Sequence, residues 1–251
     1  MKRCRRPLLA GVLVLLRGAS LWAMGSPPLI TDDPGTPGPG RWEINVGVTT
    51  ERRPGERAAE LPLIDLNYGI GETVQLKYEV PYLVQEQAGQ PRDSRFGDSA
   101  LGVKWRFHDS EKDGTTVSVY PQLQFNNPGS SSDERGLVEH GAVFLLPLQL
   151  QKNLGGVTLN LQLGREFRST ESAWLYGMAL SHQLRKNVEI AVELAGAAAA
   201  RLDRSQLTLN GGVVFEVSER CSVMFSVGRE LHNHTEPRAT LITYAGCQWR
   251  L

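Results

Sequence analysis

Apolar and polar residues alternate with a period of two along most of the chain after residue 40. In residues 41–49, for example, Trp42, Ile44, Val46 and Val48 are separated by polar residues or glycine. Neighbouring side chains of a β-strand point to opposite faces, so this pattern predicts strands with one apolar and one polar face. Twelve such segments follow one another, at residues 41–49, 62–68, 74–80, 101–107, 117–125, 142–150, 157–164, 174–180, 188–194, 207–217, 222–227 and 241–251. Pro121 lacks a backbone N–H and predicts a local irregularity in the fifth segment.

The links between these segments tend to alternate in length. Short links lie near residues 69–71, 108–114, 152–156, 185–187 and 218–220, whereas those near 52–59, 85–95, 126–139 and 231–238 are mostly longer and richer in Pro, Ser, Gly and charge. Those near 168–172 and 200–204 are shorter and depart from the rule. Bacterial outer-membrane barrels join their strands by short periplasmic turns and longer external loops. We therefore predict an all-β fold, a closed antiparallel transmembrane β-barrel of about 12 strands in an up-and-down meander. A secreted β-sandwich is the alternative.

Aromatic residues gather near both ends of the predicted strands. Trp42, Tyr68, Trp105 and Trp249 would form a periplasmic belt, and Tyr82, Phe125, Phe167 and Trp174 an outer one. Such belts mark the two interfaces of a membrane, and a β-sandwich has no need of them. Outer-membrane lipid is thus an expected partner of the apolar face.

The first 25 residues have the pattern of a secretory signal peptide. They contain five basic residues and no acidic one, then an apolar run at residues 8–16 and a small-x-small site at Ala23-Met24-Gly25. This run is too short to span a bilayer as a helix. We predict a signal peptide at residues 1–25, a Pro-rich segment at 26–39 and a barrel at 40–251. The expected location is the outer membrane of a Gram-negative cell, after Sec-type export with cleavage near Gly25.

The chain that remains after removal of residues 1–25 is mildly acidic, with 22 basic and 27 acidic residues. Nucleic-acid binding needs a concentrated basic surface, so we set that partner aside. Cys221 and Cys247 share the lipid-facing parity of the last two strands, where they form either a cross-strand disulfide or two small apolar contacts. We expect no cofactor.

Several motifs resemble a known family. Residues 28–36, Pro-Leu-Ile-Thr-Asp-Asp-Pro-Gly-Thr, are followed by Gly40-Arg41-Trp42-Glu43, and residues 97–104 open a strand on Gly97-Asp98. They are similar to the outer-membrane family described as the putative MetA-pathway of phenol degradation, over most of residues 28–251. The resemblance implies an outer-membrane barrel that passes small organic molecules, and it supplies no catalytic or ligand-binding residues.

The polar face of the strands supplies candidates for a pore lining. The candidates are Glu43, Asp65, Lys77, Glu79, Lys104, Arg106, Gln122, Gln124, Glu189, Glu193 and Glu216. A barrel of this size holds either a narrow channel or a lumen closed by its own ion pairs. Lys77, Lys104 and Arg106 would form a basic cluster, with Glu189 and Glu193 as an acidic patch elsewhere on the wall. We predict a monomeric, passive channel or transporter for an unidentified small organic solute.

Two other function classes remain as alternatives, a surface enzyme of the lipase or protease type and a non-conducting structural barrel. Ser181 and His182 are neighbours on a strand, so they point to opposite faces and cannot form a nucleophile–base pair. His140 lies near the serines of residues 126–139, with no motif around it. We therefore predict a protein that is not an enzyme.

The external loop near residues 231–238 offers a candidate metal site. Glu230, His232, His234 and Glu236 follow one another at a spacing of two, and imidazole with carboxylate suits a first-row metal. A solvated polar loop explains the same residues, and we predict no metal.

Both ends of the expected mature chain carry features that the barrel pattern does not explain. The segment 26–39 has five prolines and cannot form a ladder strand, so it lies either in the periplasm or in the lumen as a partial plug. Barrels usually end on an aromatic residue that the barrel assembly machinery reads, whereas this chain ends Trp249-Arg250-Leu251. We expect assembly to depend on Trp249 or Leu251.

Overall fold

The computed structural model describes residues 26–130, 137–138 and 141–251. The predicted signal peptide, its cleavage site near Gly25, and His140 lie outside the described residues. Within those ranges, no helix is long and apolar enough to cross a membrane.

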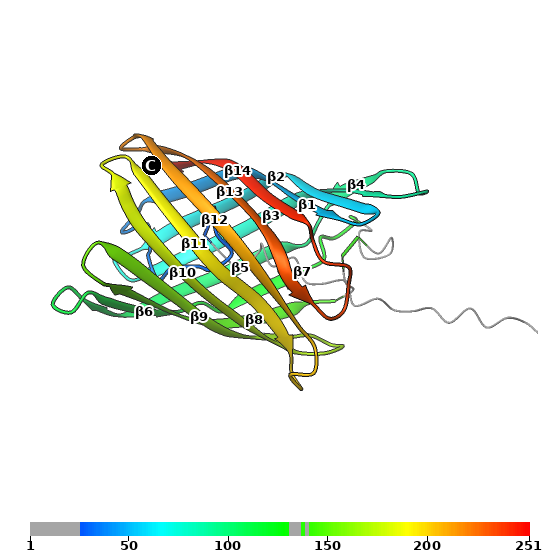
Figure 1. Cartoon of the computed structure of the whole chain (residues 1–251). Helices are drawn as coiled ribbons and strands as arrows, with labels where there is room; N and C mark the ends of the chain where they lie inside the picture. The colour runs from blue at the N-terminus through cyan, green and yellow to red at the C-terminus, as the bar shows by residue number, and fades with distance from the viewer. Residues whose placement is uncertain (1–25, 131–136, 139–140) are drawn as a thin grey trace, which may run out of the picture.

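Fourteen β-segments make up the sheet shown in Figure 1. They are β1 (Trp42–Arg53), β2 (Glu56–Ile70), β3 (Val74–Gln87), β4 (Asp93–Phe96), β5 (Ser99–Ser110), β6 (Thr115–Val119), β7 (Gln122–Phe125), β8 (Val143–Asn153), β9 (Val157–Phe167), β10 (Ala173–Arg185), β11 (Val188–Ala199), β12 (Ser205–Ser218), β13 (Cys221–Asn233) and β14 (Leu241–Arg250).

These segments form a closed antiparallel barrel of 12 strands, as the alternation predicts. β4 and β5 both pair with β3, and β6 and β7 both pair with β8, so each of these two couples is one interrupted strand of the wall. β1 pairs with β14 from Glu43↔Arg250 to Arg52↔Leu241, and this seam closes the cylinder.

The barrel is apolar outside and polar inside. Large apolar side chains such as Leu163, Trp105 and Val192 are exposed on its outer face. Lys104, Glu193 and Gln149, by contrast, are almost fully buried. A water-soluble protein shows the opposite distribution, because apolar area is driven out of water. The outer face is therefore suited to lipid.

The strand break predicted at Pro121 is present between β6 and β7. Tyr120, 1% exposed, turns into the lumen at this break. Its backbone N–H donates to the carbonyl of Pro147, and the carbonyl of Pro121 accepts from Val103, both at 3.0 Å, so the wall stays sealed around the irregularity.

The link expected as a longer external loop at residues 52–59 is different in the structure. β1 and β2 continue until Pro54 and Gly55, which form the turn between them. Gly55 has a φ of 79°, a conformation that glycine adopts without strain. The prediction was wrong because both faces of these extensions carry charged residues, which removes the apolar–polar alternation.

Cys221 and Cys247 are free. The register places Cys221 opposite Trp249 and Cys247 opposite Val223, so the two cysteines are offset along the strands. Of the two interpretations from the sequence, separate thiols on the outer wall are the one that the structure contains.

Candidate functional site

The N-terminal segment lies inside the lumen over residues 26–38, bound to the wall by hydrogen bonds to its backbone. The N–H groups of Ile30 and Thr31 donate to the two carboxylate oxygens of Glu193 at 2.8 and 2.7 Å. The N–H of Asp32 donates to Oε1 of Gln162 at 3.0 Å. Because the prolines prevent this segment from joining the sheet, side chains of the wall satisfy its backbone instead. Of the two placements left open by the sequence, the plug is the one observed, and we call residues 26–38 the plug.

Two glycines of the wall make room for the plug. A Cβ atom at Gly177 of β10 would overlap the side chain of Thr31. At Gly212 of β12, a Cβ atom would lie 3.1 Å from Cδ2 of Leu29. At these two positions the plug lies against the wall at a distance that only a residue without a side chain allows.

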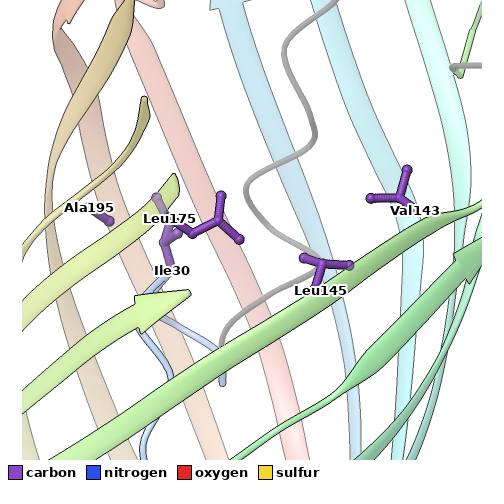
Figure 2. Packing of buried hydrophobic residues seen from close by; sticks show 5 residues of the cluster. All are labelled: Ile30, Val143, Leu145, Leu175 and Ala195. Carbon is purple, nitrogen blue, oxygen red and sulfur yellow. The ribbon is translucent and has the colours of Figure 1, made fainter. Parts of the chain in front are cut away.

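An apolar cluster anchors the middle of the plug (Figure 2). Ile30 packs with Val143 and Leu145 of β8, Leu175 of β10 and Ala195 of β11. Val143 and Leu145 alternate with outward apolar residues, so this part of β8 is apolar on both faces. Apolar residues on the inner face as well as on the lipid face indicate that an apolar segment covers the inner face, and this was the sequence signal for a plug.

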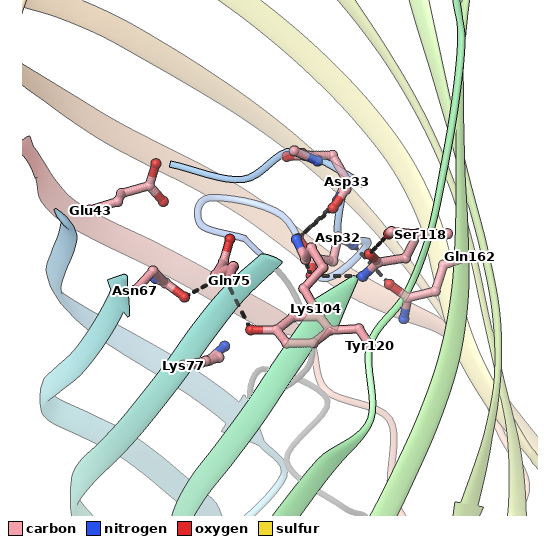
Figure 3. A network of polar contacts seen from close by, with 12 residues as sticks. Asp32, Asp33, Glu43, Asn67, Gln75, Lys77, Lys104, Ser118, Tyr120 and Gln162 are labelled. Atoms are coloured by element: carbon pink, nitrogen blue, oxygen red, sulfur yellow. Dashed lines mark hydrogen bonds and ion pairs between the residues drawn. The ribbon is translucent and has the colours of Figure 1, made fainter. Parts of the chain in front are cut away.

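Asp32 is the polar centre of the plug (Figure 3). Its carboxylate lies 3.1 Å from Nζ of Lys104 and accepts a hydrogen bond of 2.7 Å from Gln149. Lys104 also donates to the carbonyl oxygen of Asp33 at 2.6 Å, and its Nζ lies 4.7 Å from the ring centroid of Tyr120. Asp32 and Lys104 are 2% and 1% exposed, so this is an ion pair removed from water.

Asp33 follows in the plug and accepts a hydrogen bond of 2.6 Å from the N–H of Gly35. Burial raises the pKa of this carboxyl group, although the ammonium of Lys104 acts in the opposite direction. The plug thus brings a second acidic group next to the buried pair.

A second polar network joins β1, β2 and β3. Asp65 accepts hydrogen bonds from Asn45 and Asn67 at 3.1 and 3.0 Å. Lys77 lies 2.8 Å from Glu79 and 3.7 Å from Asp65. The wall charges here are paired with one another, and they fill the lumen rather than standing free in it.

The basic cluster expected from Lys77, Lys104 and Arg106 does not form as a free patch. Lys77 and Lys104 are paired as described, and Arg106 contacts Asp109 at 3.3 Å and the carbonyl of Glu72 at 2.5 Å. The expected acidic patch is also divided, because Glu193 is deeply buried under the plug while Glu189 is only half-buried.

The remaining predicted pore residues differ in depth. Glu43 is half-buried and accepts from Asn45 at 3.4 Å. Gln122 is buried, and neither polar atom of its amide has a hydrogen-bond partner in the described chain, whereas Gln124 is half-buried. Glu216 is exposed near a short turn, 3.8 Å from Arg250, so it lies at the rim rather than deep in the lumen.

A cavity of about 370 Å³ lies on the other side of the plug, toward the loops. Ile30 of the plug lines it, together with Thr49 and Glu60 on the wall and Pro54 and Pro237 in the links. Glu60 is a lumen residue that the alternation does not predict. It lies in the extension of β2, beyond a bulge between Glu60 and Leu63 that changes which residues face inward. Glu60 and Leu63 are both buried for this reason.

The candidate metal and catalytic residues have other contacts in the structure. Glu230 accepts hydrogen bonds of 2.9 Å from both terminal guanidinium nitrogens of Arg53, and Nε2 of His232 lies 2.9 Å from Nδ1 of His234. In the described ranges, no group of three or more His, Cys, Asp or Glu side chains could hold a metal ion. Nδ1 of His182 lies 2.6 Å from the carbonyl oxygen of Gly156.

Solved structures with this fold are distant in sequence. The COG4313 outer membrane channel from Pseudomonas putida F1 superposes with a TM-score of 0.69 at 12% identity, covering 90% of this chain and 100% of that one. The NanC porin has a TM-score of 0.57 at 6% identity, and the KdgM porin 0.56 at 11%; each alignment covers 82% of this chain and 98% of the porin. At these identities, the likeness shows the fold, a β-barrel of the outer-membrane type.

Sequence comparison gives one family and no individual relative. The model of the family described as Putative MetA-pathway of phenol degradation matches residues 27–246. No curated protein matches the chain.

Proposed function

The chain belongs to the family described as Putative MetA-pathway of phenol degradation, and from its plugged barrel we propose that it is an outer-membrane channel that passes small organic solutes passively. In this proposal, residues 1–25 are the export signal, lipid surrounds the apolar outer face, and the barrel assembly machinery inserts the chain. The short turns face the periplasm and the longer links face outward, as in other bacterial barrels.

One observation carries the proposal: a cavity of about 370 Å³ lies above a plug that is not part of the sheet. A volume of this order is that of a small-molecule site. Movement of the plug would open a path through the lumen without breaking a strand pairing, because the plug is held by contacts with side chains of the wall. Two of the similar structures are porins and a third is a channel, which supports the same function.

Conductance of the purified protein in planar bilayers tests the proposal. We expect discrete channel openings in salt solution, and larger or longer openings when residues 28–35 are deleted. No conductance from either protein, with both of them folded as judged by heat-dependent migration on gels, would contradict the proposal.

A non-conducting structural barrel is the second candidate, and the paired charges that fill the lumen favour it. The same measurement separates the two functions. A structural barrel conducts neither with the plug nor without it, whereas a channel conducts at least after deletion of residues 28–35.

A further inference from the structure

The cavity above the plug is built mainly by two groups of adjacent strands. Its wall comes from β1, β2 and β3 on one side of the seam and from β12, β13 and β14 on the other. Ile30 of the plug and Pro54, Thr235 and Pro237 of the links between strands complete it. A solute that enters from the loops therefore meets this cavity before it meets the plug.

Negative charge exceeds positive charge in the lining. The carboxylates that line the cavity are those of Glu51, Glu56, Glu60, Glu230 and Glu236. Among the described lining residues, Arg53 is the one cation. Arg53 contacts Glu51, binds Glu230 at 2.9 Å and lies 3.6 Å from Glu236, so one guanidinium is shared by three carboxylates. The lining keeps a surplus of negative charge that repels anions.

Glu60 is the carboxylate with the least compensation. Glu60 is 7% exposed, and the hydroxyl of Thr49 donates a hydrogen bond to Oε2 of Glu60 at 2.8 Å. No ion pair reaches Glu60 within the part of the chain that the structure describes. A buried carboxylate is costly unless a cation or several hydrogen bonds satisfy it, so this group favours a positively charged occupant.

Thr208 is an independent indication of a ligand. It lines the same cavity from β12, is 0% exposed, and its Oγ1 atom has no hydrogen-bond partner in the described residues. Buried hydroxyls are normally hydrogen-bonded, and an unpaired one facing a cavity suits a polar group of an occupant.

The lining also has an apolar part, beside the polar side chains of Gln85, Gln87 and Gln206. Ala58, Leu83, Val84 and Ile242 contribute hydrocarbon surface, together with Ile30 of the plug. Such surface favours a ligand with an apolar body over a hydrated metal ion. An ammonium group with a hydrocarbon substituent satisfies both parts of the cavity, because its N–H groups donate to carboxylate and hydroxyl oxygens.

From this arrangement we infer that the cavity between the plug and the loops is a binding site for a small organic ammonium ion, with Glu60 as the counter-ion and Thr208 as a hydrogen-bond acceptor. This inference rests on the proposed channel function for its biological meaning, since it names the class of solute that the channel accepts. The binding itself requires no conductance and is tested separately.

Titration calorimetry on the folded protein in detergent tests the site. The three probes, benzylammonium, benzyl alcohol and benzoate, share a benzene ring and differ in their polar group. We expect benzylammonium to bind and benzyl alcohol and benzoate to bind at least about tenfold more weakly, since a charge-assisted hydrogen bond is stronger than one between neutral groups. Glu60→Gln should lower benzylammonium affinity about tenfold or more, Glu60→Asp should restore part of it, and Thr208→Val should lower it less. Glu111→Gln, in an exposed turn at the other end of the barrel, is the matched control and should change nothing.

Equal binding of all three probes, absence of benzylammonium binding, or unchanged affinity in folded Glu60→Gln would overturn the inference. Conductance across a salt gradient separates this failure from failure of the proposed function. A barrel that binds benzylammonium and does not conduct refutes the channel and leaves the site. One that conducts but binds the probes alike refutes the site and leaves the channel.

Discussion

Nζ of Lys104 in β5 lies 3.1 Å from the carboxylate of Asp32 in the plug. This pair joins the first residues after the predicted signal peptide to the middle of the barrel wall. The same carboxylate also binds Gln149 of β8, so a single side chain of the plug connects separate parts of the cylinder. The position of the plug is therefore set by the inward charges of the wall.

The first prediction concerns this ion pair. Asp32→Asn leaves the Lys104 ammonium buried without its counter-charge, and loss of one partner of a buried pair costs about 3–5 kcal/mol. We expect the plug to leave the lumen and the mean conductance in planar bilayers to rise several-fold. The double variant Asp32→Asn with Lys104→Met is the control, because it removes both charges, and its effect should be smaller than the sum of the two single changes. Additive effects would show that the pair does not hold the plug.

The second prediction concerns Glu193. Glu193→Ala leaves the N–H groups of Ile30 and Thr31 without acceptors, at a cost of about 1–3 kcal/mol for each buried group. We expect amide hydrogen exchange at Ile30 and Thr31 to accelerate by at least about tenfold, while the strands stay protected. Glu189→Ala on the same strand is the control, since among the described residues no hydrogen bond joins Glu189 to the plug. Equal rates of amide hydrogen exchange at Ile30 and Thr31 in the two variants would show that Glu193 does not hold the plug.

Much of the barrel could be predicted from residues in its wall. The alternation of Trp42, Ile44, Val46 and Val48 follows directly from lipid on one side and a polar lumen on the other. The hairpin at Pro54 and Gly55 could not be predicted in this way, because beyond the apolar belt neither face of a strand needs to be apolar. The alternation of apolar and polar residues predicts a strand where one face contacts lipid and the other a polar lumen, and it predicts nothing where both faces are polar.

The third prediction concerns the close approach of the plug to β10. Gly177→Ala places a methyl group where the Thr31 side chain now lies, so we expect displacement of the plug and a wider pore. Exclusion of polyethylene glycols of graded size from the open channel measures that width. Gly211→Ala is the matched control, because the nearest atom to its Cβ, the carbonyl oxygen of Ala191, is 3.7 Å away. A pore of unchanged size in Gly177→Ala would contradict the placement of Thr31.

The fourth prediction concerns assembly. Trp249 lies on β14, opposite Ile44 of β1 and Cys221 of β13, and is 39% exposed on the outer face. If the assembly machinery reads this last strand, Trp249→Ala should lower the amount of folded barrel in outer-membrane fractions several-fold. Trp174→Ala is the control, since Trp174 is equally exposed at 39% but lies at the start of β10. Equal losses would indicate a general effect of removing an aromatic side chain.

The lumen was harder to predict than the wall. Parity predicts that Lys104 and Glu193 face inward, but it does not predict their partner, the plug, which has no periodicity of its own. Glu60 was missed because the bulge before Leu63 reverses the parity of its strand. The contacts between the irregular plug and the regular wall depend on the three-dimensional structure. The pattern of residue types along the sequence does not specify them.

The seam between β1 and β14 also dictates an order of events. Its two strands come from opposite ends of the barrel sequence, so the cylinder cannot be sealed until the final strand has been delivered. The plug precedes β1, while Lys104, Gln149 and Glu193 lie much later in the chain, so the plug is synthesised before the wall residues that bind it. Until the seam closes, the chain carries two unpaired edges that can recruit other chains. A product that stops before Leu241 is accordingly a seed for aggregation rather than a smaller pore.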